Sequence, residues 1–177
     1  MSLVYTGTAV DWAAISLLVL DVDGVLTDGR LTSSDGTESK AFHVQDGCAI
    51  KVWQQVGGKV AILSGRESPD ALRRAGELGI KLIRLGQSDK LSAYDALVRS
   101  AECENSAVAY VGDDLPDTAP MKECVLPVAV ANALGQVKRA ARYVTRRRGG
   151  EGAVAEVIEL ILRKQRRWSP HQQGIRK

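Results

Sequence analysis

Two aspartates near the start of the chain, Asp21 and Asp23, stand where an apolar run ends. The run covers residues 17–20 and contains no polar side chain, and Gly24 follows the second aspartate directly. Carboxylates only two positions apart repel each other unless a cation or a shared proton relieves the repulsion. The pair therefore indicates a cation site or acid–base chemistry at this point of the chain.

Three further polar clusters also follow segments with a strand-like pattern. They are Ser64 after residues 59–63, Lys90 shortly after residues 80–85, and Asp113, Asp114 and Asp117 after residues 107–111. Each cluster alone is ordinarily a turn residue, a helix cap or a solvated charge. Ligands of parallel sheets, however, bind beyond the carboxyl ends of the strands. We therefore expect the four clusters to meet at one edge of a sheet.

The residue types suit phosphoryl transfer. Clustered carboxylates in a chain with only two histidines favour a hard, oxygen-liking cation such as Mg²⁺. Lys90 offers a point charge and Ser64 a hydrogen bond, as phosphate binding requires. One carboxylate can attack phosphorus to form an aspartyl-phosphate, and a second can protonate the leaving alkoxide and then activate water.

The stretches that position these residues alternate between strand-like and helix-like patterns. Strands are expected at 17–20, 59–63, 80–85, 107–111 and 125–130, and helices begin near 46, 69, 90, 134 and 153. This alternation predicts an α/β fold with a Rossmann-like, doubly wound and mainly parallel sheet. Asp35-Gly36 predicts the turn of a projecting β-hairpin over residues 29–44, and residues 143–144 are expected to form an edge strand.

Composition is that of an ordinary globular protein, with 45% apolar and 25% charged residues among 177. We expect one domain over residues 1–168 and a C-terminal tail over 169–177. No apolar stretch approaches the ~20 residues of a membrane span, and the N-terminus lacks the pattern of a secretory signal, which together predict a cytoplasmic protein with no membrane partner. The three widely spaced cysteines are expected to be reduced and mostly buried.

The net charge of +3 is unevenly placed, with basic runs at 146–148 and 163–167. Aromatic residues suited to base stacking are nearly absent from these runs, so we expect no nucleic-acid partner. The run at 146–148 is interpreted either as a plain surface charge run or as a contact for an acidic substrate.

Taken together, the four clusters resemble the motifs of the haloacid dehalogenase superfamily of phosphotransferases, and they occur in that superfamily's order. The matching segments are Asp-Val-Asp-Gly-Val at 21–25, Ser-Gly-Arg at 64–66, Lys90, and Gly-Asp-Asp at 112–114 with Asp117. A P-loop nucleoside triphosphatase is excluded because the sequence has no G-x-x-x-x-G-K-[ST]. A response-regulator receiver would not explain the D-x-D spacing or the late Gly-Asp-Asp.

The resemblance implies a role for each matching residue. Asp21 resembles the nucleophile and Asp23 the general acid/base. Asp113 would hold Mg²⁺ together with the Asp21 carboxylate and the Asp23 backbone carbonyl, while Asp114 and Asp117 would support the site. The residues implied to bind the phosphate are Ser64, Gly65, Arg66 and Lys90.

The spacing between the motifs leaves no room for a cap domain, because only the hairpin and one helix fit between Asp23 and Ser64. The segments at 27–29, 40–47, 86–90 and 143–146 with 149–154 resemble the 3-deoxy-D-manno-octulosonate 8-phosphate phosphatase family. Its members are Mg²⁺-dependent homotetramers in which the hairpins associate. The resemblance implies a phosphorylated sugar acid as substrate and a homotetramer formed through the 29–44 hairpin.

One position departs from that family, which usually has arginine where this chain has Gln45. Loss of this cation would weaken binding of the sugar carboxylate and leave the phosphoryl-transfer chemistry untouched. The alternatives are a nonulosonate 9-phosphate phosphatase, a broader sugar phosphatase, or a regulatory subunit that has lost turnover. Intact carboxylates, Ser64 and Lys90 argue against the last of these.

Overall fold

The computed structural model describes residues 10–34 and 37–168. Six strands form one sheet, namely β1 (Leu17–Leu20), β4 (Lys59–Leu63), β5 (Leu82–Arg84), β6 (Val108–Gly112), β7 (Leu126–Ala129) and β8 (Tyr143–Val144). Six α-helices accompany them, namely α1 (Val44–Gln55), α2 (Pro69–Leu78), α3 (Lys90–Ser100), α4 (Thr118–Glu123), α5 (Gly135–Ala140) and α6 (Ala153–Lys164). A separate antiparallel pair consists of β2 (Thr32–Ser34) and β3 (Thr37–Ser39).

The sheet has the strand order β5-β4-β1-β6-β7-β8, and every pairing within it is parallel. The prediction of an α/β fold with a mainly parallel sheet is therefore confirmed. β1 lies between β4 and β6, and all four of its side chains are fully buried. An uninterrupted apolar run forms such a strand because both of its faces are covered.

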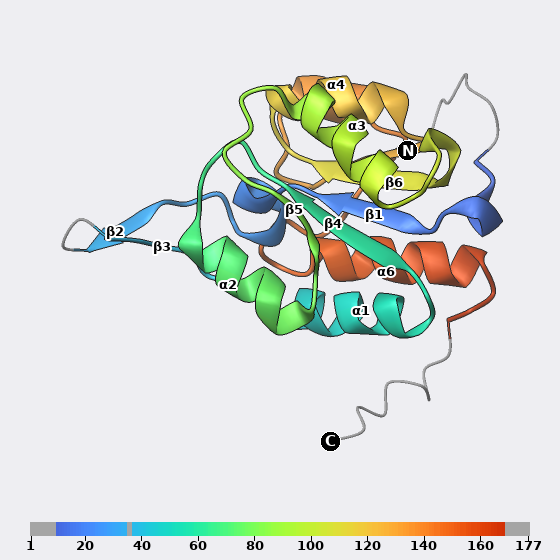
Figure 1. The fold of residues 1–177 in the computed structure, drawn as a ribbon, viewed down its shortest axis with the longest axis horizontal. Coiled ribbons are helices and arrows are strands. Elements are labelled where there is room, and N and C mark those ends of the chain that lie inside the picture. Colours follow the sequence, from blue (N-terminus) through green and yellow to red (C-terminus); the bar gives the residue numbers. More distant parts are fainter. Residues whose placement is uncertain (1–9, 35–36, 169–177) are drawn as a thin grey trace.

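Helices cover both faces of the sheet. Figure 1 shows α1, α2 and α6 on one side and α3 and α4 on the other. Trp53 of α1 is buried, and its indole N–H donates to the Lys59 carbonyl at 2.9 Å. On the opposite face, Tyr94 of α3 meets Tyr110 of β6 edge to face, with ring centroids 6.1 Å apart. These packed layers hold the strand ends rigidly in place.

The helix starts show how local sequence fixes the loops around the sheet. Ser68 caps α2 as its position before Pro69 predicts, because its Oγ accepts the Ala71 N–H at 3.1 Å. α6 begins after Gly152, which has no side chain to cap it. Asp46 of α1 replaces that cap by accepting the Ala155 N–H at 2.8 Å, so the first turns of α1 and α6 are tied together.

The predicted hairpin is present as β2 and β3, and it projects from the body of the molecule (Figure 1). Its expected turn at Asp35-Gly36 lies outside the described residues. At its base, Leu31 and Val44 are exposed by 55% and 72%, whereas Phe42 packs against the core. The hairpin thus leaves apolar side chains uncovered where it joins the domain.

Other expectations need small corrections. β5 is shorter than the strand expected at 80–85, and α1 begins at Val44, two residues before Asp46. Cys48 is exposed, contrary to expectation, because it lies on the outer face of α1.

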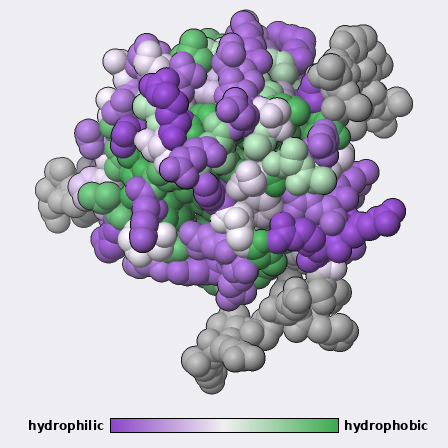
Figure 2. All heavy atoms as spheres, turned by 45° about the vertical axis from the view of Figure 1, so that its right-hand side comes forward, coloured by the Kyte–Doolittle hydropathy of each residue, from purple (hydrophilic) through white to green (hydrophobic). Residues whose placement is uncertain are grey.

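Charged and polar side chains dominate the face in Figure 2. No helix in the described part of the chain is long and apolar enough to cross a membrane.

Candidate active site

The polar clusters predicted from the sequence follow four neighbouring strands. Asp21 follows β1, Ser64 follows β4, Lys90 begins the helix after β5, and Asp113 follows β6. Because β5, β4, β1 and β6 are adjacent and parallel, their carboxyl ends form one edge of the sheet. The structure confirms that Asp21, Lys90, Asp113 and Asp117 lie close together there.

Lys90 joins two of the carboxylates. Its Nζ donates to Asp21 Oδ1 at 2.8 Å and to Asp117 Oδ1 at 2.7 Å, and all three side chains are almost completely buried. Burial acts to lower the pKa of Lys90, but the charges of Asp21 and Asp117 outweigh it, so the pKa is raised. Lys90 is therefore a fixed ammonium ion beside the end of β1.

Asp117 has all its oxygens occupied. Oδ1 accepts from Lys90 and from the Tyr110 hydroxyl, the latter at 2.7 Å, and Oδ2 accepts the backbone N–H groups of Asp113 at 2.9 Å and Asp114 at 3.1 Å. These four donors hold a fully buried charge. Asp117 therefore positions Lys90 and the start of the loop after β6, and it has little capacity left for a ligand.

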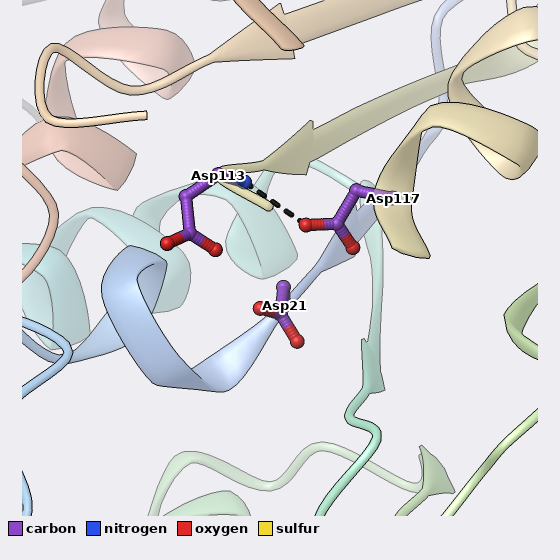
Figure 3. Close-up of side chains that lie close together, drawn as sticks. All are labelled: Asp21, Asp113 and Asp117. Carbon is purple, nitrogen blue, oxygen red and sulfur yellow. Dashed lines mark hydrogen bonds between the residues drawn. The ribbon is translucent and has the colours of Figure 1, made fainter. Parts of the chain in front are cut away.

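Asp113 differs in having an unpartnered oxygen. Figure 3 shows its carboxylate beside those of Asp21 and Asp117, and oxygens of the three groups lie within 4.8 Å of one another. Asp113 Oδ1 is buried and accepts no hydrogen bond from the described residues. Burial, and then the charge of Asp21, raises the pKa of Asp113 to about 8. The site therefore lacks positive charge around Asp113.

The surroundings of Asp21 also disfavour its charged form, despite its contact with Lys90. Burial, and then the charge of Asp117, raises the pKa of Asp21 to about 7, and Lys90 only partly opposes this. Two carboxylates with raised pKa values and one unpartnered oxygen suit a hard cation bound by oxygen ligands. The residues present thus fit Mg²⁺.

Gly24 explains why a glycine follows the two aspartates. It lies in the tight turn Val22–Leu26 with a φ of +87°, a conformation that disfavours side chains. A Cβ atom at this position would also collide with the Asp113 carboxylate. The turn after β1 can therefore pass directly against the loop after β6 only because residue 24 is glycine.

Ser64 and its neighbours have separate positions. Ser64 is buried at the end of β4, where its Oγ accepts the Arg66 N–H at 3.2 Å. Gly65 lies beside Lys90, since a Cβ on it would be 3.9 Å from Lys90 Cε. The Arg66 guanidinium instead donates to Glu38 Oε2 at 2.6 Å, and its Nε is 3.8 Å from Asp23 Oδ2.

The structure does not place the Asp23 side chain with the Lys90 cluster. It pairs with Lys40, in the segment after β3. Asp114 is exposed and caps the short turn Leu115–Asp117 by accepting the Leu115 N–H at 2.7 Å. Sequence reasoning missed Lys40 and Tyr110 as site residues. Tyr110 gives no signal because it lies within the apolar run of β6.

Comparisons with known proteins agree with this geometry. A family model described as haloacid dehalogenase-like hydrolase matches residues 83–158. The 3-deoxy-D-manno-octulosonate 8-phosphate phosphatase of Yersinia pestis is 46% identical over 151 residues, covering 85% of this chain and 81% of that protein. This chain belongs to the 3-deoxy-D-manno-octulosonate 8-phosphate phosphatase family.

Solved structures of this family show the same fold. The cobalt-bound phosphatase of Haemophilus influenzae superposes with a TM-score of 0.89 at 38% identity, covering 93% of this chain and 99% of that chain. The Moraxella catarrhalis phosphatase, solved with magnesium ion, phosphate ion and KDO (3-deoxy-D-manno-octulosonate), has a TM-score of 0.84 at 45% identity, covering 88% of this chain and 90% of that one. The expected superfamily and family are therefore confirmed.

The raised pKa values predict how stability depends on pH and metal. Without metal, Asp21 and Asp113 hold protons in the folded state at pH values where the unfolded chain has lost them. Between about pH 4 and 8, stability in EDTA should therefore fall as pH rises. Mg²⁺ replaces these protons, so saturating Mg²⁺ should raise the Tm by roughly 5–10 °C at about pH 8.5 and by much less at about pH 5.5.

Thermal unfolding followed by fluorescence would measure this. Asp113→Asn is the matched control because it keeps the side-chain shape and removes one of the two titrating charges, and it should lose most of the Mg²⁺ effect at both pH values. Equal Mg²⁺ shifts at both pH values in the wild type would contradict the assignment.

Proposed function

We propose that this protein is an Mg²⁺-dependent phosphomonoesterase that hydrolyses 3-deoxy-D-manno-octulosonate 8-phosphate to the free sugar acid and phosphate. The observation that carries the proposal is the Asp21 carboxylate at the end of β1, held by Lys90 and adjacent to the unpartnered Asp113 oxygen. This arrangement supports a nucleophile, an ammonium ion and a cation site at one edge of the sheet. Membership of the family supports the reaction and the substrate.

Asp21 is the proposed nucleophile. Its carboxylate oxygen attacks phosphorus, the bond from phosphorus to the sugar oxygen breaks, and an aspartyl-phosphate forms on Asp21. Mg²⁺, held by the Asp21 and Asp113 carboxylates and the Asp23 backbone carbonyl, would offset the repulsion between the Asp21 carboxylate and the phosphoryl oxygens. Lys90 stabilises the negative charge on those oxygens from its fixed position.

Asp23 is the proposed general acid and base. It gives its proton to the sugar oxygen as that oxygen leaves, and then takes a proton from the water that attacks the aspartyl-phosphate. The second attack releases inorganic phosphate and restores the Asp21 carboxylate.

The phosphate oxygens are assigned to Ser64, the backbone N–H of Gly65, and Lys90. Ser64 Oγ and Gly65 lie at the same edge of the sheet as Asp21, and Gly65 adjoins Lys90. Arg66 stays a prediction for phosphate binding, because its guanidinium is paired with Glu38. Asp114 and Asp117 support the site through the loop after β6.

The position of Gln45 bears on the substrate. Its Oε1 accepts from Arg147 Nη1 at 2.9 Å, so a guanidinium lies directly beside the residue where the family usually has arginine. Arg147 belongs to the basic run at 146–148, and it offers a cation for the carboxylate of a sugar acid. This supports a phosphorylated sugar acid over a neutral sugar phosphate, and a cytoplasmic enzyme is the accompanying expectation.

Phosphate release from a panel of esters tests the proposal. With Mg²⁺ present, 3-deoxy-D-manno-octulosonate 8-phosphate should give the highest kcat/KM, ahead of a nonulosonate 9-phosphate and of neutral hexose phosphates. Asp21→Asn should lower kcat by at least about 10⁴-fold, since the nucleophile is lost while shape is kept. Equal turnover by wild type and Asp21→Asn would refute the mechanism. A preference for the nonulosonate ester would mean that this ester, and not the octulosonate ester, is the substrate.

We also propose that the protein is a homotetramer formed through the 29–44 hairpin. The support is the projecting hairpin and the exposed apolar side chains of Leu31 and Val44 at its base. Exposed apolar groups of this kind mark association surfaces when they are grouped.

Light scattering on a sizing column should give four times the mass of the 19.0 kDa chain. Replacing Leu31 and Val44 together by aspartate should shift the protein toward smaller species, while Leu72→Asp, at an exposed position on α2, should leave the mass unchanged. A wild-type protein that stays monomeric at high concentration would contradict the proposed assembly.

A further inference from the structure

Four charges of alternating sign connect the hairpin with the loops after β1 and β4. Lys40 donates to Asp23 Oδ1 and lies 3.2 Å from Glu38 Oε1. Arg66 donates to the other oxygen of Glu38 at 2.6 Å, and its Nε lies 3.8 Å from Asp23 Oδ2. The ring formed by these four residues brings two hairpin charges to the proposed general acid.

Lys40 is the most enclosed member of this ring. Its side chain is 2% exposed, against 23% for Asp23, 35% for Glu38 and 49% for Arg66. A lysine is buried to this degree only where carboxylates compensate for the lost hydration of its ammonium group. Because an unpaired buried ammonium group is unfavourable, the Lys40 side chain stays in contact with Asp23 and Glu38. A surface lysine, in contrast, samples many rotamers.

The backbone of Lys40 is fixed as well. Its N–H donates to Asp70 Oδ2 at 2.8 Å, and Asp70 lies in the first turn of α2, where it also pairs with Arg73 at 3.0 Å. Asp70 of α2 therefore fixes the main chain of Lys40, and Asp23 fixes its ammonium group. Its position does not depend on the exposed strands of the hairpin alone.

The two carboxylate oxygens of Asp23 have different surroundings as a result. Oδ1 is bound to Lys40, whereas Oδ2 is buried and lies 3.8 Å from Arg66 Nε without accepting a hydrogen bond from any residue that the structure describes. A carboxylic acid that donates a proton must present one oxygen to the reacting atom in a fixed orientation. An aspartate without a partner on Oδ1 would rotate about its χ angles and present either oxygen.

We propose that Lys40 is a positioning residue for the general acid: it binds Asp23 Oδ1 and so fixes the orientation in which the Asp23 carboxyl group meets the substrate. The inference rests on the proposed function, in which Asp23 gives a proton to the sugar oxygen as the phosphorus–oxygen bond breaks. Glu38 contacts Lys40 from the hairpin side, and Arg66, in the loop after β4, holds Glu38. The hairpin thereby contributes to the chemistry of its own chain.

The dependence on the leaving group separates this role from a merely structural one. A sugar alkoxide needs a proton in order to leave, whereas p-nitrophenolate leaves without one. Because kcat/KM reports only the steps up to departure of the leaving group, the later hydrolysis of the aspartyl-phosphate does not affect it. Loss of a positioned acid must therefore lower kcat/KM more for an alkyl ester than for p-nitrophenyl phosphate.

The test compares Lys40→Met with Lys81→Met, a control at an exposed lysine that directly precedes β5. For Lys40→Met we expect kcat/KM for 3-deoxy-D-manno-octulosonate 8-phosphate to fall about 10- to 100-fold more than kcat/KM for p-nitrophenyl phosphate. This difference is smaller than the full rate contribution of a general acid, because Asp23 itself is still present. Asp23→Asn should show the same difference between the two esters. The double variant Lys40→Met/Asp23→Asn should be no slower than Asp23→Asn alone, since both changes remove one function.

Unfolding of each variant is measured alongside, and Lys40→Arg, which keeps the charge and a donor, should restore part of the difference. Equal losses for the two esters, or a double variant slower than Asp23→Asn, would show that Lys40 only stabilises the fold and would overturn the inference. If the wild type hydrolyses p-nitrophenyl phosphate and some alkyl phosphates but not the octulosonate ester, the proposed substrate fails. The comparison is then made with the best alkyl phosphate, and Lys40 is judged on that result.

Discussion

The buried bridge from Lys90 to Asp21 and Asp117 is the interaction on which the rest of the site depends. Three carboxylates lie within a few ångströms of one another at the end of the sheet, and one ammonium ion with Tyr110 and two backbone N–H groups neutralises only part of that charge. Breaking such a bridge would leave uncompensated buried charge, which is strongly destabilising. The unpartnered oxygen of Asp113 is what remains after these contacts are made, and it explains why the site requires a cation.

The sheet supplies the constraint that creates this concentration of charge. β1 lies between β4 and β6, so the residues that follow each strand converge, and the turn after β1 approaches Asp113 closely because Gly24 has no side chain. The loop after β8 completes the enclosure. Asn132 accepts the Gly149 N–H at 2.7 Å and donates to the Gly24 carbonyl at 3.3 Å, and Gly150 donates to the Val25 carbonyl at 3.0 Å. The turn Val22–Leu26 is thus held from two sides.

The sequence was sufficient for the sheet and for the residues that end its strands, because an apolar run followed by a charged residue is a local pattern. Asp21, Lys90 and Asp113 could be predicted in this way, and the structure places them together. It was not sufficient for contacts between segments distant in the chain. Lys40 lies 17 positions from Asp23, and nothing in the residues around it indicates that its side chain is buried on that aspartate. Tyr110 was likewise indistinguishable from its apolar neighbours in β6.

The central claim is that Asp21 carries the phosphoryl group. It is tested most directly by acid-quenching the protein during turnover of 3-deoxy-D-manno-octulosonate 8-phosphate and reducing the acyl phosphate with borohydride. The reduction converts a phosphorylated aspartate to homoserine, which peptide mass spectrometry locates. The account predicts homoserine at position 21 in wild type, a larger amount in Asp23→Asn if the first step still proceeds, and none in Asp21→Asn. Homoserine at another aspartate, or none during steady turnover of the wild type and of Asp23→Asn, would contradict it.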